Sequence, residues 1–402
     1  MPAKHLLSAA ALAGAAALPA QYFEARNAAM GGVGVASSRY VSAGWANPAL
    51  LTSAAPTERF GLIIPAAGVR AYDATDLAND VDAFVDSFEA LDNNPLATAQ
   101  QFAGLGDQLT ALGGRRVNSE LGGGLAFAMP SDKVAWSIHA QNYTDLQLFA
   151  KIDPLDDDLI ANTVAGAPFP ALDSNARALG VAVTELGVSL ATRFELSGVG
   201  VGVGVTPKFQ RVDTFNYAAT LDTFDSSDFD EEQYRNDNDA FNCDAGLTLE
   251  WDDAGVRFGL MARNLVAETY TTVDSLGSSF DYELGPQATV GLSWRTDAVT
   301  LAADADVNPL ERFDDEDLAA ALSPSPSFSD DVQMARLGAE FTACDWLQLR
   351  AGYAHDLEGT LDDAISAGVG LNGNGGVLRI DLSGVYVDDQ SYGAVAQVTL
   401  TF

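Results

Sequence analysis

Positive charge is scarce in this sequence. Its 402 residues include 21 Lys and Arg but 56 Asp and Glu, which gives a formal net charge of −35. So large an acidic excess repels the phosphates of DNA and RNA, and it argues against a nucleic-acid-binding protein. The same excess suits a surface that meets divalent cations.

Side chains that carry chemistry are also few. The two cysteines, Cys243 and Cys344, allow one disulfide at most and no zinc cluster. We expect both to be unpaired, because one falls on an outward strand face and the other at a short turn. Neither His139 nor His355 has a metal or nucleophile partner nearby in the sequence, and no lysine follows a glycine as a phosphate-binding loop requires. We therefore expect no enzyme, no cofactor and no metal site.

Long apolar runs are missing after the first twenty positions, where nothing approaches the roughly 20 residues of a membrane-spanning helix. The start of the chain is different. Lys4 and His5 precede an uncharged Ala/Leu-rich stretch at 6–18, and Pro19-Ala20 offers a small-residue cleavage site. This pattern predicts a signal peptide at residues 1–20 and export at least to the periplasm of a Gram-negative cell.

The dominant pattern is an alternation of apolar with small or polar residues, which predicts β-strands with one apolar face. It continues to the last residue, where Leu400 and Phe402 flank Thr401. The predicted strands lie at 58–72, 119–129, 133–151, 180–196, 199–213, 240–251, 255–264, 286–296, 298–307, 334–343, 346–356, 364–372, 376–387 and 391–402.

The links between these strands separate a barrel from a soluble sandwich, which would alternate in the same way. Short turns such as 130–132 and 197–198 alternate along the chain with long acidic stretches such as 73–118 and 152–179. Outer-membrane barrels have this arrangement, with tight periplasmic turns and long extracellular loops. The sequence therefore predicts an all-β fold, a transmembrane antiparallel β-barrel of about fourteen strands in the outer membrane, in contact with lipid and lipopolysaccharide.

The acidic runs at 156–158, 228–232 and 314–317 fall in the predicted loops. The simpler interpretation of these runs is that their carboxylates are solvated charges on exposed loops. Weak binding of Ca²⁺ or Mg²⁺ that bridges to lipopolysaccharide phosphates is the alternative.

Charged residues fall on the face of the strands that should point into the lumen, since a charge facing the middle of the bilayer costs a few kcal/mol. They either pair with one another or with a plug, or they line an open pore. The principal predicted lumen charges are Arg257, Arg263, Arg295, Arg336, Arg350, Arg379, Glu250, Glu340 and Asp381. The glycines of the alternating Gly/Val run at 198–204 should face the lumen too and leave room for a plug.

The first long loop has helical rather than strand spacing. Apolar residues recur every three or four positions and predict a helical extracellular insertion at 75–112 made of two amphipathic helices. These helices either pack their apolar faces on the barrel rim or form a hydrophobic mouth for a ligand. The candidate mouth residues are Leu77, Val81, Phe84, Val85, Phe88 and Leu91.

A glycine-rich segment with an Asn-Pro turn, at 21–57, precedes the first strand. Its motif consists of Met30, Gly31, Gly32, Asn47, Pro48, Ala49 and Leu50. The arrangement resembles FadL-like outer-membrane barrels, in which such a stretch forms a hatch inside a fourteen-stranded cylinder. It is also similar to the barrel-type conjugal-transfer TraF proteins, together with the later stretches 262–265 and 347–353. The resemblance implies that 21–57 is a hatch-like segment in the lumen and that 58–402 is the barrel.

Three functions agree with these features. The first is the binding or passive passage of a hydrophobic small molecule, which the resemblance to FadL-like barrels implies. The second is a structural or interaction accessory of a conjugation or secretion apparatus, without transport activity. The third is a porin for polar solutes.

Overall fold

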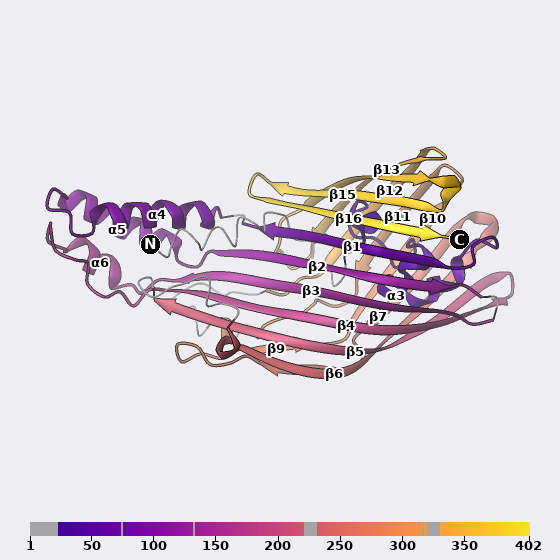
Figure 1. The fold of residues 1–402 in the computed structure, drawn as a ribbon, viewed down its shortest axis with the longest axis horizontal. Helices are drawn as coiled ribbons and strands as arrows, with labels where there is room; N and C mark the ends of the chain where they lie inside the picture. The colour runs from indigo at the N-terminus through magenta and orange to yellow at the C-terminus, as the bar shows by residue number, and fades with distance from the viewer. Residues whose placement is uncertain (1–22, 74, 132, 221–230, 315–316, 320–329) are drawn as a thin grey trace.

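The computed structural model of the chain describes residues 23–73, 75–131, 133–220, 231–314, 317–319 and 330–402. The expected signal peptide at 1–20 lies outside these residues. Within them, fourteen strands form one closed barrel (Figure 1). The strands are β1 (Gly61–Tyr72), β2 (Arg116–Met129), β3 (Ala135–Lys151), β4 (Asn175–Leu196), β5 (Val199–Thr220), β6 (Arg235–Trp251), β7 (Val256–Arg263), β10 (Gln287–Arg295), β11 (Val299–Asp306), β12 (Met334–Cys344), β13 (Leu347–Asp356), β14 (Ala364–Gly373), β15 (Leu378–Asp388) and β16 (Ser391–Thr401).

Each barrel strand pairs antiparallel with its neighbours, and the first and last strands close the cylinder. At this seam Gly61 lies opposite Thr401, and the ring of Phe402 stacks on that of Phe60 at 4.6 Å. The predicted fold class, an antiparallel barrel of about fourteen strands, is confirmed.

The connections at the two ends of the barrel differ. At one end the strands are joined by tight turns, as between β4 and β5, where Ser197 and Gly198 have φ of 52° and 81°. Two consecutive residues with positive φ match the twist of a two-residue hairpin. The opposite end carries the long connections, including the helices α4 (Leu77–Leu91), α5 (Ala99–Leu112) and α6 (Asp156–Ala161) (Figure 1).

The wall is much taller on one side than on the other (Figure 1). Strands β4 and β5 have 22 residues each, whereas β7 and β11 have 8. The extra length is at the end with the long connections, where β4 begins at 175 instead of the predicted 180 and β5 continues to 220 instead of 213. A short hairpin, β8 (Glu268–Thr271) with β9 (Asp281–Leu284), also lies at this end and was not predicted.

Burial alternates along the strands as a membrane barrel requires. On β4, Leu186, Val188 and Leu190 are exposed on the outer face, while Glu185, Gly187 and Ser189, which alternate with them, are buried. Both cysteines are free, as predicted. Among the described residues, no helix is long and apolar enough to cross a membrane.

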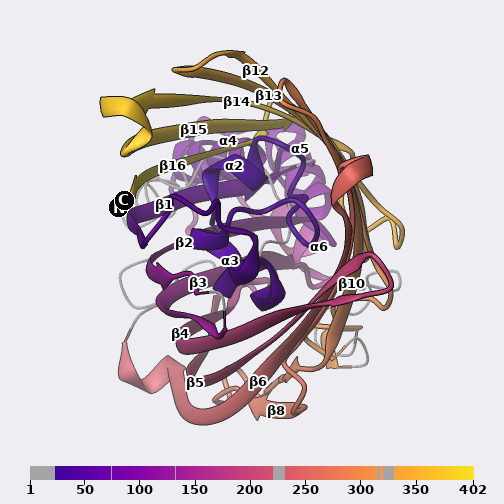
Figure 2. The same ribbon diagram turned by 90° about the vertical axis from the view of Figure 1, so that its right-hand side faces the viewer.

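The N-terminal residues 23–53, called here the luminal segment, run through the inside of the cylinder (Figure 2). Short helical turns make up the segment: α2 (Ala25–Ala28), η2 (Tyr40–Ser42), α3 (Ala43–Ala46) and η3 (Pro48–Ser53). They contact strands from opposite sides of the barrel, α2 meeting β14 to β16 and η3 meeting β4 to β6.

Candidate functional site

The lumen is the candidate site, and the luminal segment occupies it at the level of the short strands. Met30, Ala49 and Leu50 of the predicted motif are at most 1% exposed. The backbone N–H of Gly31 donates to the hydroxyl of Ser366 on β14 at 2.9 Å. The structure thus places the motif residues against the inner wall.

The Asn-Pro turn is fixed by the side chain of Asn47. Its amide nitrogen lies 2.9 Å from the carbonyl of Val35 and 3.3 Å from those of Leu247 and Leu260, which belong to two adjacent strands. Its side-chain oxygen accepts from the N–H of Ala49 at 3.1 Å. One buried amide therefore ties the two halves of the segment to β6 and β7.

Glycines on the inner wall make space for this segment. A Cβ atom at Gly352 would lie 1.9 Å from the nitrogen of Gly31, and one at Gly204 would lie 2.5 Å from the carbonyl carbon of Pro48. Similar contacts occur at Gly246, where a Cβ would meet the Asn47 side chain at 2.0 Å. In the Gly/Val run, Gly204 is thus in close contact with the luminal segment.

An ion-pair network holds the start of the segment. Arg26 donates to both carboxylate oxygens of Glu340 at 3.0 Å, and Glu340 also accepts from Arg350 at 2.7 Å. Arg350 in turn lies 2.7 Å from Asp381. Three of the predicted lumen charges, Glu340, Arg350 and Asp381, thus lie together. Their partner in the luminal segment, Arg26, was not predicted from the sequence.

A second set of contacts holds residues 34–36. The carboxylate of Asp304 accepts from the N–H groups of Gly34 and Val35 at 2.6 and 2.9 Å. The hydroxyl of Ser293 donates to the carbonyl of Ala36 at 2.9 Å. These polar wall side chains satisfy backbone groups that have no partner within the segment.

The remaining predicted lumen charges fall into two groups. Arg257 and Arg193 both bind Glu250, and Arg336 pairs with Asp306 at 2.9 Å. Of the others, Arg263 donates to the carbonyls of Trp45 and Ala46. Arg295 is exposed at the end of β10, and Arg379 is half-buried at the start of β15.

Farther from the tight turns lies a buried polar cluster that the sequence did not reveal. The ammonium of Lys208 lies 2.9 Å from Glu185 and 3.0 Å from Asp244, and Gln141 and Gln210 also donate to Glu185. Three strands supply the charged side chains. The alternation along β4 and β6 could not show that Glu185 and Asp244 share one lysine.

Beyond this cluster, four inward residues of the tall strands are apolar, although Asp145 and Thr214, the residues opposite Val181, are polar. Leu179, Val181 and Val183 on β4 and Val212 on β5 form a patch that is buried beneath the β8–β9 hairpin and the following loop. The covering side chains are Tyr270, Phe280, Tyr282, Leu284, Phe313 and Leu318. We call Leu179, Val181, Val183 and Val212 the inner apolar patch.

The helical insertion packs mainly on itself. Leu77, Phe84 and Leu91 of α4 are buried against α5, α6 and the loop that follows α6. Val81, Val85 and Phe88 are partly buried in the same cluster. The structure therefore brings the six candidate mouth residues together, but against other apolar side chains.

Burial alters the acid–base properties of Glu24 at the start of the segment. The carboxylate is 3% exposed and accepts from the N–H of Asn27 at 2.6 Å. Its removal from water, reinforced by the nearby negative charge of Asp381, raises the pKa of Glu24 above its ordinary value.

The predicted acidic runs at 228–232 and 314–317 lie partly outside the described residues. Among the residues that the structure describes, no three His, Cys, Asp or Glu side chains converge as metal ligands would.

A family of known proteins shares this sequence pattern. The family described as F plasmid transfer operon, TraF, protein matches residues 44–306, well over half of the chain. The chain belongs to this TraF family. No curated protein sequence matches it.

Solved structures show that this TraF family member has a FadL-like barrel. The toluene transporter TbuX of Ralstonia pickettii superposes with a TM-score of 0.55 at 14% identity, covering 96% of this chain and 99% of the transporter. A FadL homologue of Pseudomonas aeruginosa gives a TM-score of 0.55 at 13% identity, with 97% and 99% coverage. The monoaromatic hydrocarbon channel CymD gives 0.54 at 13% identity, with 96% and 99% coverage. The predicted resemblance to FadL-like barrels and to the TraF family is confirmed.

Proposed function

We propose that the chain is an outer-membrane channel of a Gram-negative cell that binds hydrophobic small molecules and lets them pass passively. The observation that carries the proposal is the inner apolar patch. Leu179, Val181, Val183 and Val212 form an apolar patch on the inner side of the barrel wall, covered by loops at the end with the long connections. Passage of hydrophobic molecules also agrees with the channel fold, since TbuX and CymD are described as a toluene transporter and a hydrocarbon channel.

In this proposal a ligand enters by displacing the loops that cover the patch. Aromatic side chains such as Phe280 and Tyr282 then exchange their contacts with Val181 for contacts between Val181 and the ligand. The luminal segment is the second barrier. Its contacts with the wall, among them those of Arg26 with Glu340, would have to break for a ligand to pass.

The test is uptake of labelled oleate and labelled toluene by cells that lack their own long-chain fatty-acid transporter. Expression of the full chain should restore uptake of at least one of them. Val181→Asn, which puts an amide in the patch, should reduce uptake severalfold. Val164→Asn is the matched control, because Val164 is 72% exposed, and it should leave uptake unchanged.

A folded, surface-exposed barrel that transports neither probe would refute the proposal for these substrates. The second candidate, an accessory of a conjugation apparatus, would then take its place. It is favoured by the match to a family named for the F plasmid transfer operon. Loss of plasmid transfer on deletion of the gene, with uptake unaffected, would support it. Steady ion conductance in planar bilayers would instead favour the porin.

A further inference from the structure

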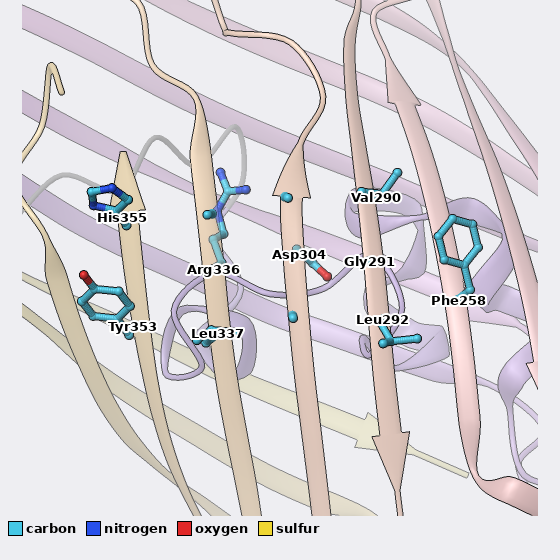
Figure 3. A pocket seen from close by; sticks show the side chains of 12 residues that line it. Phe258, Val290, Gly291, Leu292, Asp304, Arg336, Leu337, Tyr353 and His355 are labelled. Carbon is cyan, nitrogen blue, oxygen red and sulfur yellow. The ribbon is translucent and has the colours of Figure 1, made fainter. Parts of the chain in front are cut away.

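The outer face of the short wall contains a hollow that is separate from the contacts of the lumen. Its cavity volume is about 650 Å³, and it spans β7, β10, β11, β12 and β13. Figure 3 shows Phe258 toward one side of it and Tyr353 and His355 toward the other. We call it the outer groove.

The strand register explains the shape of the outer groove. Ala303 on β11 lies opposite Leu292 on one side and Leu337 on the other. Ala305, two residues along, lies opposite Ala335 of β12. Three methyl side chains therefore form a floor between larger side chains. Because neighbouring strands lie about 4.8 Å apart, the five strands give the groove a width of roughly 19 Å.

The outer groove is closed toward the lumen. On the inner side, Val35 and Ala36 of the luminal segment pack against Gly291, where an added Cβ would lie 3.0 Å from Val35. Asp304, between the two alanines of β11, is bound to the backbone of the same segment. The groove is thus a recess in the outer surface, backed by protein.

We propose that the outer groove binds an acyl chain of a lipid in the outer leaflet, in preference to the rest of the wall. The inference rests on the membrane location in the proposed function. The surrounding outward side chains are apolar and exposed, with Leu292 at 52% and Leu337 at 57%, so hydrocarbon surrounds the groove. A flexible chain that fills the recess gains close contacts with its floor that it cannot make on a convex wall.

The position along the strands indicates which leaflet supplies the chain. Ala303 and Ala305 lie in the half of β11 (Val299–Asp306) that is remote from the tight turn before it. With the tight turns at the periplasmic side, this half lies in the outer leaflet.

Polar groups at the same end mark a place for a headgroup. The hydroxyl of Tyr353 donates to Asp363 at 2.6 Å, and the Nδ1 atom of His355 lies 2.6 Å from the other oxygen of this carboxylate. Both side chains line the groove and bring hydrogen-bonding atoms to the edge of its apolar floor. An aromatic ring with a polar tip is typical of the boundary between hydrocarbon and headgroups.

The test is photo-crosslinking of the full chain in liposomes that contain a phosphatidylcholine with a diazirine in one acyl chain. After irradiation, mass spectrometry locates the adducts. We expect the peptides that contain Ala303, Ala305 and Ala335 to be labelled severalfold more than those of the tall wall. The double variant Ala303→Leu/Ala305→Leu fills the floor and should reduce this excess to the level elsewhere.

Ala140→Leu is the matched control. Ala140 is an exposed alanine on the outer face of β3, opposite Leu125 and Leu186, and its replacement should not change labelling of the groove. Uniform labelling, or an excess that survives in the double variant, would overturn the proposal. A dimeric protein without lipid adducts in the groove, with the dimer seen by size-exclusion chromatography with light scattering, would also overturn it and assign the groove to a second copy. Uptake is measured in a separate experiment, so a failure of the proposed transport would not change the labelling results.

Discussion

Replacing Gly352 with alanine should push the luminal segment away from the wall. The new Cβ would lie 1.9 Å from the nitrogen of Gly31 and 2.1 Å from the carbonyl carbon of Met30. Both obstacles are backbone atoms, so no side-chain rotation can relieve the clash. The segment and β13 would have to separate by roughly 1.5 Å to reach ordinary contact distance.

The cost follows from the kind of atoms that must move. Overpacking a well-packed interior typically costs about 1–3 kcal/mol when side chains can adjust. Because backbone must move here, we expect about 3 kcal/mol of lost docking free energy for Gly352→Ala. Gly384→Ala is the control, since its nearest neighbour is the carbonyl oxygen of Gly393 at 3.7 Å. Alanine is favoured over glycine in a strand by about 0.5–1 kcal/mol, so the control should be neutral or slightly stabilising.

A buried cysteine in the segment reports the effect. In a background without Cys243 and Cys344, Ser37→Cys places a thiol at a fully buried position. Its reaction with a water-soluble maleimide in proteoliposomes should be about 100-fold faster in Gly352→Ala, as about 3 kcal/mol implies. Equal rates in Gly352→Ala, Gly384→Ala and the parent would refute the argument that close backbone contact holds the segment.

Three further predictions concern the luminal segment and the seam between β1 and β16. Arg26→Met leaves the buried Glu340 with one fewer partner. Breaking a buried pair costs about 3–5 kcal/mol, and Arg350 remains as the second partner. The same thiol assay should therefore show a loss of docking free energy of about 3 kcal/mol. Burial raises the pKa of Glu24 above 4.5, so the Glu24 carboxyl binds its proton more tightly when the segment is docked than when the segment is released. Docking should therefore be strongest at low pH and weaken as pH rises from about 4.5 through the raised pKa. Glu24→Gln, with the same thiol as reference, should remove this dependence, and an identical pH profile in both proteins would contradict it. Phe402→Ala removes the ring stacked at 4.6 Å on Phe60 and should lower the free energy of unfolding in urea by at least the 0.5–1.5 kcal/mol of an aromatic pair; an unchanged transition midpoint would show that the seam does not depend on this contact.

The sequence predicted the barrel well because its strongest pattern has a simple cause. Lipid outside and polar groups inside impose a period of two on every spanning strand, as Leu186 to Leu190 illustrate. The extensions of β5 and β6 beyond this zone were missed. There a run such as Asn236 to Asp239 is polar on both faces and looks like a loop, although it pairs with β5 residues Arg211 to Thr214.

The interior was only partly predictable for a different reason. Parity assigned Glu340 and Asp381 to the lumen correctly, but it could not supply the distances across the cylinder. Which charges meet depends on the register between strands and on the path of the luminal segment. Arg26 was missed because it lies in a short helical turn, where period two gives no information. The fold of 268–284 escaped detection because four-residue strands are too short to show a pattern.

The glycine contacts on the inner wall also constrain how the protein can be assembled. A cylinder that closed first would enclose gaps opposite Gly204, Gly246 and Gly352, and Glu340 would lack its partner Arg26. The segment precedes β1 in the chain, while the seam needs β16, the last strand to be made. Docking of the segment before these two strands join would fill the gaps as the cylinder closes. Joining of the first and last strands would then enclose the segment.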